Sequence, residues 1–541
     1  MNRRMASLVA AALLLFTLAP GVHADDTDPP EVVIGERLFL ETRFAQFFFA
    51  NSGGNVNQSL ATGDPVMDTN VTLTGTIPGP FAGQSMNCRQ CHLVDEQKDT
   101  AGGGNRTYGD FARRSPIPAR GDGLTETPRN SPPLVDASLP RRGAFFLHFD
   151  GEFDSPEALV KGTFTGRNFG WLPGEEAQAV AHLANVIRGD DGTSPFAADT
   201  GSKSYAVLLK ATDPSIPKEL KLPKTFRIDV AMASDAKILD AVAKLVGAYV
   251  RSLTFAQDHT GAFVASPYDV FLKKNGLPNK PKKSETPAAY SKRLKAAIDG
   301  LANPQFVTDA DGHFELHAQA FTFGATQLAG LKLFLGTANC VACHPAPDFT
   351  DFAFHDTGAS QDEYDGIHGA GAFAALSIPN LSARSAAPQN FLPPSAKLPN
   401  GTGVFRAVPL SGHPERTDLG LWNVYENDAL ATPKSDRKIR TLLCKSLRSQ
   451  GKQCTPDALL DAAVARFKTP GLRDLANGAP FLHTGGKDTV ADVIAFYATV
   501  SDLARGGQLR NGDPEIANIH IQAEDRSPLG AFLDGLTEDY N

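Results

Sequence analysis

The sequence contains Cys88-Arg89-Gln90-Cys91-His92 and Cys340-Val341-Ala342-Cys343-His344, two copies of the pattern C-x-x-C-H. This pattern is the attachment signature of a c-type haem, because its two thiols can form thioethers with one porphyrin and the histidine can ligate the iron. A redox dithiol or half of a zinc site also uses C-x-x-C, but the adjoining histidine and the repetition argue against both. We therefore expect two covalently bound haem c groups, with His92 and His344 as iron ligands.

The composition is that of a globular protein with many loops. Of 541 residues, 42% are hydrophobic and 21% are charged, and 49 glycines and 38 prolines favour the irregular backbone that wraps a cofactor. The formal net charge is −8. An acidic protein is poorly suited to bind nucleic acid or an anionic membrane surface, so we expect neither as a partner.

The N-terminus has the pattern of a secretory signal over residues 1–24. Two arginines precede an apolar run that is too short for a comfortable membrane span, and Val22-His23-Ala24 is a cleavage site of the small-x-small type. We therefore expect a soluble, exported protein of the bacterial periplasm, where c-type haem is attached. In that oxidising compartment the two remaining cysteines, Cys444 and Cys454, are expected to close a loop as a disulfide.

The supply of methionine and histidine limits the sixth ligands of the two irons. Only three methionines lie beyond the signal sequence and none follows Cys340, so oxygen or nitrogen ligands are favoured at the second haem. No histidine lies between His92 and His148, so the first haem has no second imidazole nearby in the sequence and we expect it to be open. A haem with one protein ligand can bind a small molecule, whereas one with two usually carries electrons.

The expected fold class is mainly α, with two cytochrome c-like haem domains, long loops and insertions. Clean strand alternation is scarce, whereas residues 236–253 form the strongest amphipathic helical pattern in the chain. A related phrase precedes both haem motifs: Gly35-Glu36-Arg37-Leu38-Phe39 and Gly330-Leu331-Lys332-Leu333-Phe334. This weak internal repeat indicates two related domains, each of which enters its haem site from a helix.

In this arrangement the sequence resembles the bacterial dihaem cytochrome c peroxidase family, including the MauG branch that oxidises a partner protein. The resemblance covers most of the mature chain, apart from insertions near residues 45–84, 270–320 and 360–440. Besides the two C-x-x-C-H motifs, the matching phrases, in family order, are Gly35-Glu36-Arg37-Leu38-Phe39, Arg129-Asn130-Ser131-Pro132, Phe149-Asp150-Gly151-Glu152, Ala248-Tyr249-Val250-Arg251-Ser252-Leu253, Phe349-Thr350-Asp351, Phe467-Lys468-Thr469-Pro470-Gly471-Leu472-Arg473 and Ala479-Pro480-Phe481-Leu482-His483. Each phrase is weak alone, but their order around two haem sites is specific.

The resemblance implies two haem domains with different tasks. Residues 25–255 would form the N-terminal domain with the peroxidatic haem, and residues 256–541 the C-terminal domain with the electron-transfer haem. The relay tryptophan of the family has no obvious counterpart, because Trp171 and Trp422 are the only tryptophans and neither falls between the first haem motif and the Asp-Gly turn. A tyrosine such as Tyr108, or direct transfer between the haems, would have to serve.

The resemblance implies a catalytic acid at Glu157. The family places its distal glutamate shortly after the Asp-Gly turn, and Glu157 lies seven residues after Asp150. A carboxylate there could move a proton from the inner to the outer oxygen of a peroxide as the O–O bond breaks. Without the resemblance, Glu157 would be a carboxylate in the first turn of a helix after Ser155-Pro156, where the helix dipole favours negative charge.

The resemblance also implies an iron ligand at Tyr497 and an interdomain calcium ion. The family places the sixth ligand of the second haem fourteen residues after the histidine of a Pro-aromatic-x-His phrase, and counting from His483 reaches Tyr497. Peroxidases have methionine there and MauG has tyrosine. Otherwise Tyr497 would be a core tyrosine of an apolar helix. The backbone carbonyls of Gly478 and Pro480 match a phrase that helps to hold the calcium.

The sequence therefore predicts a periplasmic dihaem c-type peroxidase. It would reduce hydrogen peroxide with electrons from a small cytochrome c or cupredoxin, or oxidise a substrate protein as MauG does. The alternative is a dihaem electron-transfer protein without peroxidase activity, in which Met86 or a distant histidine caps the first iron.

Overall fold

The computed structural model describes residues 28–58, 69–72, 75–78, 87–88, 91–92, 120, 122–124, 127–139, 145–314, 319–430, 433–476 and 478–539. The predicted signal sequence, residues 1–24, lies outside these ranges, as do Met86 and Tyr108. The chain is mainly helical, as predicted, and the described strands form two short antiparallel pairs. Within these ranges, no helix combines the length and the hydropathy that crossing a membrane requires.

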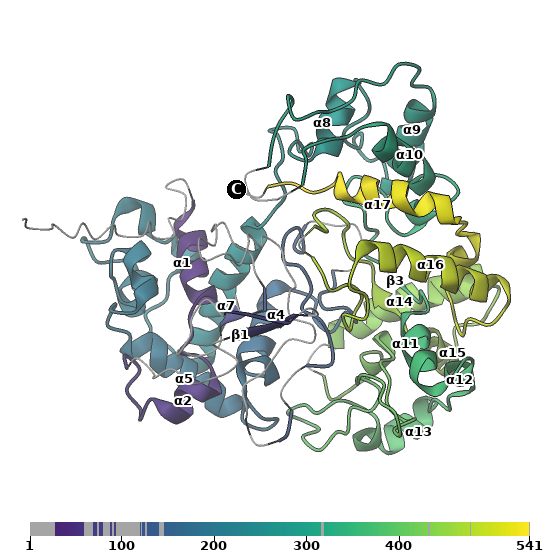
Figure 1. Ribbon diagram of the computed structural model, residues 1–541. Helices are drawn as coiled ribbons and strands as arrows, with labels where there is room; N and C mark the ends of the chain where they lie inside the picture. Colours follow the sequence, from purple (N-terminus) through teal and green to yellow (C-terminus); the bar gives the residue numbers. More distant parts are fainter. Residues whose placement is uncertain are drawn as a thin grey trace, which may run out of the picture.

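The N-terminal helices gather around α7 (Asp235–Ser252), which confirms the helix predicted over residues 236–253. Its buried side chains recur every three or four residues and form one apolar face. α7 packs against α1 (Pro30–Phe39), α4 (Pro156–Phe164) and α5 (Glu176–Gly189), on the left of Figure 1. The other elements of this part are α2 (Gln46–Asn51), α6 (Tyr205–Lys210), β1 (Thr69–Thr72) paired with β2 (Gly75–Pro78), and the 3-10 helices η2 (Arg167–Phe169), η3 (Pro195–Thr200), η4 (Lys218–Leu220) and η5 (Lys224–Phe226).

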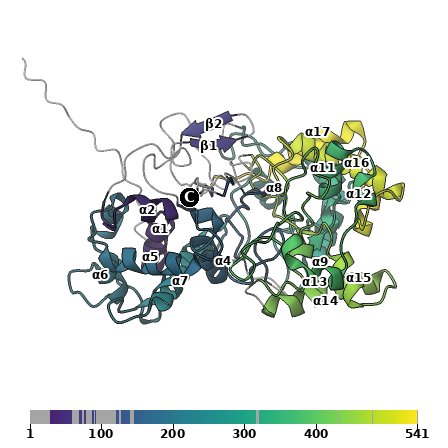
Figure 2. The same cartoon turned by 90° about the horizontal axis from the view of Figure 1, so that it is seen from below.

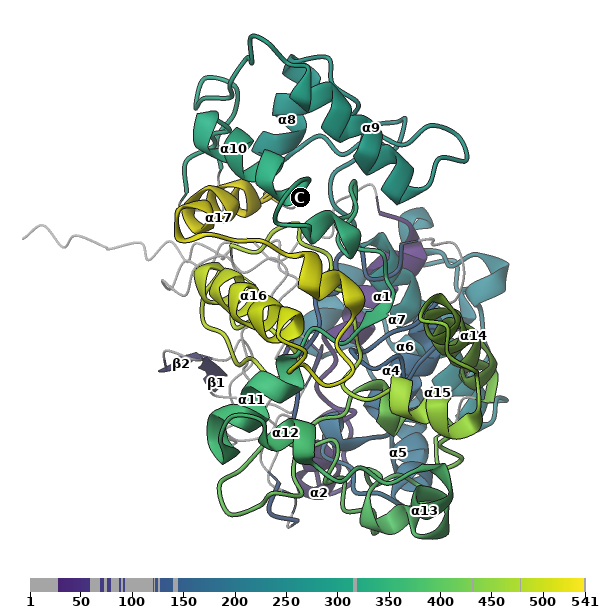
Figure 3. The same ribbon diagram turned by 90° about the vertical axis from the view of Figure 1, so that its right-hand side faces the viewer.

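The second haem motif lies in a group of C-terminal helices. α10 (Ala325–Phe334) leads into the 3-10 helix η6 (Cys340–Ala342), so the chain enters this motif from a helix, as predicted. α10 packs against α17 (Arg526–Asp534), and α17 packs against α16 (Val490–Arg505), as Figure 3 shows. The group is completed by α8 (Pro267–Lys274), α9 (Pro287–Asp299), η9 (Pro514–Asn518) and η10 (Ala523–Asp525).

The repeated sequence phrase places a glycine at a helix crossing in both groups. A Cβ atom on Gly35 of α1 would lie 2.3 Å from the carbonyl oxygen of Leu245 in α7. On Gly330 of α10, a Cβ atom would lie 1.9 Å from the carbonyl oxygen of Pro528 in α17. Only glycine permits such close backbone approaches, so the internal repeat marks the same packing device in both groups.

The large insertion near residues 360–440 contributes to a third hydrophobic core, in which Trp422 and Leu421 are fully buried. Cys444 and Cys454 form the predicted disulfide beside it, with their Cα atoms 5.3 Å apart. The elements around this third core are β3 (Phe354–His355) paired with β4 (Phe467–Lys468), α11 (Ala359–His368), α12 (Ala372–Ala375), α13 (Leu381–Ala386), α14 (Pro433–Ser449), α15 (Pro456–Ala462), η7 (Pro388–Asn390) and η8 (Leu421–Asn423).

The first core draws on residues 32–263 and the second on residues 268–536. In Figure 2 the N-terminal helices lie on the left and the helices from α8 onwards on the right. The domain boundary after residue 255 stays a prediction.

Candidate haem centres

The second C-x-x-C-H motif folds as one tight turn. The backbone N–H of His344 donates to the Cys340 carbonyl at 2.9 Å, and that of Cys343 donates to the same carbonyl at 3.3 Å. Both cysteines and His344 line one cavity. The Nδ1 atom of His344 lies 2.8 Å from the carbonyl oxygen of Phe349. This contact orients the ring and leaves Nε2 for a metal ion.

The cavity beside this turn has a volume of about 300 Å³ and a mostly apolar lining that includes Phe334, Ile494 and Leu533. Burial raises the pKa of the Cys340 thiol to about 12, so an ionised sulfur is disfavoured there whereas a neutral thioether is not. Neither Cys340 nor Cys343 is in a disulfide. An apolar cavity with two unpaired thiols and an available imidazole nitrogen fits a haem c.

Tyr497 lines the same cavity from α16. The helix buries Phe496 and Val500 and keeps the Tyr497 side chain at the cavity wall. Burial, and then the sulfur atoms of Cys343 and Cys340, raise the pKa of the Tyr497 phenol above its usual range. The structure therefore brings Tyr497 together with both cysteines, and its ligation of iron stays a prediction.

His355, whose role the sequence alone leaves ambiguous, also lines this cavity. The Nε2 atom of His355 lies 2.9 Å from the carboxylate of Asp351, and Nδ1 lies 2.7 Å from that of Asp513. Burial alone would lower the pKa of His355, but the two carboxylates outweigh burial and raise it to about 12. Both ring nitrogens are engaged by carboxylates, which favours the protonated form of His355 beside the second site.

The first C-x-x-C-H motif makes the same turn. The N–H groups of His92 and Cys91 donate to the Cys88 carbonyl at 2.9 and 3.2 Å. Cys91 is buried in the first core, and neither thiol is in a disulfide. Burial, and then the nearby His148, lower the pKa of His92 to about 4, while the Pro132 carbonyl opposes them. A buried, neutral imidazole is the form that ligates iron.

Charged side chains surround the Asp-Gly turn near the first motif. Arg129 donates to Asp150 at 2.6 Å and to the two oxygens of Asp418 at 2.5 and 2.7 Å. Arg406 donates to Asp150 and, at 3.1 Å, to Glu152. The sequence analysis missed Arg406 and Asp418 because both come from the large insertion, more than 250 positions from Asp150 and Glu152 in the sequence.

Arg167, in η2, has one N–H group that makes no hydrogen bond in the described part of the chain. Its Nε atom is buried and has no hydrogen-bond partner there. Burial, and then repulsion from Arg406, lower the pKa of Arg167 to about 10. A bound anion would relieve both effects, and the carboxylates of a haem are such anions. The residues of the first site therefore also fit a haem.

Glu157, the predicted acid, lies in the first turn of α4 after the N-cap Ser155. Arg251 in α7 donates to both of its carboxylate oxygens, at 2.6 and 2.7 Å. The Glu157 side chain is 30% exposed. Among the described hydrogen bonds, none joins Glu157 to a C-x-x-C-H motif, and its catalytic role stays a prediction.

One short segment connects the two sites. Pro132 lines the second cavity, and its carbonyl acts on His92 of the first site. The backbone N–H of Asn130 donates to the His483 carbonyl at 2.8 Å, and its side chain donates to the Pro480 carbonyl at 2.8 Å. Residues 130–132 therefore contact residues of both haem sites.

Two further sequence predictions concern this interface. Trp171 is buried in the first core and Trp422 in the third, and neither lines the second cavity. Gly478 lines that cavity, whereas the Pro480 carbonyl accepts a hydrogen bond from Asn130. The calcium ion stays a prediction.

Comparison with known proteins gives one match at the level of sequence. The chain is 25% identical over 216 residues to the cytochrome-c peroxidase IdrP2 of Denitromonas iodatirespirans, and the match covers 39% of this chain and 39% of that protein. No protein-family model matches the chain. The match confirms the predicted resemblance to cytochrome c peroxidases over part of the chain.

Two solved structures can be superposed on most of the chain. The dihaem peroxidase BthA from Burkholderia thailandensis is 15% identical, with 95% of this chain and 89% of that chain covered and a TM-score of 0.42. A MauG-like protein associated with microbial copper homeostasis is 16% identical, with 98% and 96% covered and a TM-score of 0.43. At these TM-scores the superpositions are loose.

Proposed function

We propose that the chain, which is similar over part of its length to a cytochrome-c peroxidase, is a periplasmic dihaem c-type peroxidase. It takes two electrons from a small redox protein, such as a cytochrome c or a cupredoxin, and two protons from water. With these it converts one hydrogen peroxide into two waters. The observation that carries this proposal is the contrast between two C-x-x-C-H sites, one among charged side chains and one beside an apolar cavity. That contrast suits one haem for reaction and one for electron storage.

The side chains of each motif would hold one haem through two thioethers and one imidazole. When bound, the first haem would supply the iron at which peroxide reacts, and the second would supply electrons. Arg167 would bind a carboxylate of the first haem, because its buried Nε has no other partner among the described residues. The carbonyl of Phe349 would orient the His344 imidazole.

Oxidation of a partner protein is a second form of this activity, and Tyr497 at the second cavity is the observation that favours it. A phenolate ligand stabilises ferric iron and lowers the reduction potential relative to methionine. The two forms differ in the source of electrons, which is either a soluble donor or a side chain of the substrate protein.

Glu157 is the acid that the family resemblance proposes. A carboxylate paired with an arginine accepts hydrogen bonds and has no proton to donate, so this role requires the pair with Arg251 to open. Glu157→Gln tests it directly. A loss of about 10²–10⁴-fold in peroxide reduction supports the role. Full turnover in the variant, with both haems attached, removes Glu157 from it.

The proposed location is the periplasm. The predicted signal over residues 1–24 supports export, and the disulfide between Cys444 and Cys454 suits an oxidising compartment. Mass spectrometry of the exported protein should find a chain that begins at Asp25 and carries two haem adducts. Fewer than two adducts would contradict the proposal.

Electron paramagnetic resonance of the ferric holoprotein tests the function as a whole. We expect a high-spin signal from one haem and rapid reaction with one equivalent of hydrogen peroxide. Two low-spin haems that are inert to peroxide in every redox state would instead identify a dihaem electron carrier.

A further inference from the structure

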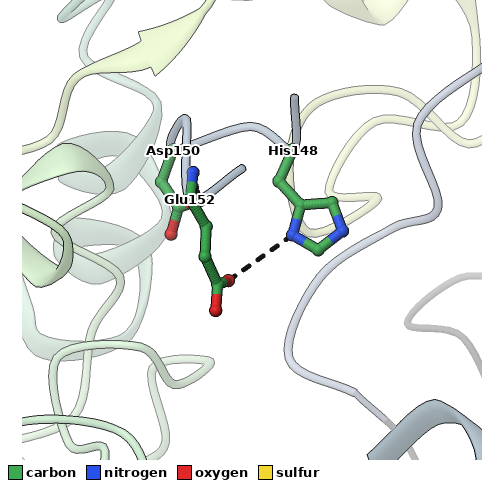
Figure 4. A group of neighbouring side chains, drawn as sticks. All are labelled: His148, Asp150 and Glu152. Atoms are coloured by element: carbon green, nitrogen blue, oxygen red, sulfur yellow. Dashed lines mark hydrogen bonds and ion pairs between the residues drawn. The ribbon is translucent and has the colours of Figure 1, made fainter. Parts of the chain in front are cut away.

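A histidine and two carboxylates form a tight cluster on the Asp-Gly turn. They are His148, Asp150 and Glu152, and one ligand atom from each lies within 4.8 Å of the others (Figure 4). The cluster does not suit a cation, because Asp150 is already paired with Arg129 and Arg406, and Glu152 with Arg406. The group that remains for chemistry is therefore the imidazole of His148.

Glu152 holds one nitrogen of that imidazole. Its Oε2 atom lies 3.5 Å from Nδ1 of His148 and 3.1 Å from Nη1 of Arg406. Burial alone would raise the pKa of Glu152, but Arg406 and His148 outweigh burial and lower it to about 2, so Glu152 is a carboxylate. When Nδ1–H is bound to a carboxylate, Nε2 is the basic nitrogen. Figure 4 shows this second nitrogen pointing away from both carboxylates.

The backbone of the turn fixes the position of His148. Its φ is +62°, in the left-handed region that side chains of this size seldom adopt. The N–H of Leu147 donates to the Phe153 carbonyl at 2.8 Å and closes the turn. The Phe153 ring meets the imidazole edge-on, with 4.9 Å between the ring centroids. Such strained residues persist where the surrounding structure holds them, and they cluster at functional sites.

The same turn is tied to the iron ligand of the first motif. Arg129 binds Asp150, which lies two residues after His148. The carbonyl of Pro132, three residues after Arg129, acts on His92. Residues 129–132 therefore link the turn to His92. His148 lies close enough to contribute to the lowered pKa of the His92 imidazole. His148 therefore presents its second nitrogen away from Glu152 and near the first C-x-x-C-H motif.

We propose that His148 is the acid–base residue of the first haem site, and that Glu152 and Arg406 are its positioning residues. This inference rests on the peroxidase function proposed above and assigns its proton transfer. Nε2 of His148 accepts the proton of the inner oxygen of hydrogen peroxide and returns it to the outer oxygen. The O–O bond breaks, and the outer oxygen leaves as water with both peroxide protons. The inner oxygen becomes the second water after the donor protein supplies two electrons and solvent supplies two protons.

An acid–base residue needs an atom that is free to accept a proton. His148 has such an atom, whereas Glu157 would first have to separate from Arg251. Both oxygens of Glu157 are occupied by Arg251. Nε2 of His148 makes no hydrogen bond among the described residues and points away from both carboxylates, so it is placed to accept and return a proton. The carboxylate behind it would also stabilise the imidazolium that forms during the transfer.

The test compares three variants of the ferric holoprotein. His148→Asn removes the basic nitrogen and suits the left-handed backbone, which asparagine tolerates. Glu152→Gln weakens the positioning contact. His413→Asn is the matched control, because His413 is an exposed histidine whose Nδ1 lies 3.1 Å from Glu415.

Two rates and one spectrum are measured. One rate is cyanide binding, in which hydrogen cyanide must lose its proton to reach the iron, and the other is single-turnover reaction with peroxide. We expect His148→Asn to slow both by about 10²-fold or more and Glu152→Gln to slow both by about tenfold, with His413→Asn unchanged. The resting paramagnetic resonance spectrum should be the same in all four proteins.

Wild-type rates of both reactions in His148→Asn, with two haems attached, overturn the proposal and leave the peroxidase function standing. A change from low to high spin in that variant also overturns it, because His148 would then be an iron ligand. If His148→Asn does not fold, wild-type rates in Glu152→Gln overturn the proposal. If the wild-type protein does not reduce peroxide, the proposed function is wrong. If His148→Asn still slows cyanide binding in that case, the placement of His148 at the first haem stands.

Discussion

The two C-x-x-C-H sites have the same local turn and different surroundings. In each, the histidine N–H donates to the carbonyl of the first cysteine at 2.9 Å, because the same five-residue pattern folds in the same way. Around His344 lies a mostly apolar cavity, whereas His92 lies near a turn held by Arg129 and Arg406. The motif determines how a haem is attached, and the surroundings determine what the attached haem can do.

The largest effect is expected from removing one attachment site at a time. Cys88→Ser combined with Cys91→Ser should remove the first haem and abolish peroxide reduction. Cys340→Ser combined with Cys343→Ser should leave the first haem attached but stop sustained turnover, because the electron store is lost. Mass spectrometry counts the haems, and a donor-oxidation assay measures turnover. Sustained turnover without the first haem would reverse the assignment of the two sites.

Tyr497→Met tests the apolar site alone. We expect the reduction potential of the second haem to rise by on the order of 100 mV or more, because a thioether ligand favours ferrous iron more than a phenolate does. Potentiometric titration measures this change. Tyr425→Phe, buried in the third core, is the control. An unchanged potential in Tyr497→Met would show that Tyr497 is not an iron ligand.

The repeated glycines compare the frameworks of the two sites. Gly35→Ala and Gly330→Ala should each lower the free energy of unfolding by about 2 kcal/mol or more, because a Cβ atom would overlap a backbone carbonyl at each helix crossing. Urea unfolding followed by circular dichroism measures the loss. Gly366→Ala, a helical position with open space around it, should show none. Equal stability of all three variants would refute the shared packing role.

Short sequence patterns predicted the parts of this molecule that depend on local chemistry. The mainly helical class and the helix over residues 236–253 were predicted from periodicity, and the disulfide between Cys444 and Cys454 from the compartment. Each depends on residues that are close together in the chain, so one sequence is enough to find them.

The environment of the first site depends instead on distant pairings. Arg406 reaches Asp150 across 256 positions of the sequence, and Arg251 reaches Glu157 across 94. No local pattern specifies such partners. One signal was available, because the spacing of His148 and Glu152 across a glycine turn is short enough for a contact. The contact has functional meaning only beside Arg406 and His92, which the fold supplies.

Asp136 provides the finest distinction between the two sites. It lines the second cavity, and its carboxylate accepts a hydrogen bond from the Phe255 N–H at 3.2 Å. Burial raises the pKa of Asp136 to about 7, although the Phe255 N–H opposes the shift. The carboxyl group is therefore neutral in the folded protein below about pH 7 and ionises as the pH rises through that value. In the unfolded chain it ionises near pH 4, so the stability linked to this group falls as the pH rises from about 4 to 7.

The ionisation of Asp136 should change the reduction potential of the second haem and leave that of the first haem unchanged. A new negative charge favours ferric iron, so the potential of the second haem should fall as the pH rises through 7. A unit charge about 10 Å away at an effective dielectric constant of about 20 gives a shift of about 70 mV. Asp136→Asn should remove this pH-dependent change in potential and leave the potential at pH 5 unchanged. The control Asp309→Asn, on an exposed loop, should keep the change. If the variant removes a step from the first haem instead, Asp136 belongs to the charged site, and the division into one polar and one apolar haem environment is wrong.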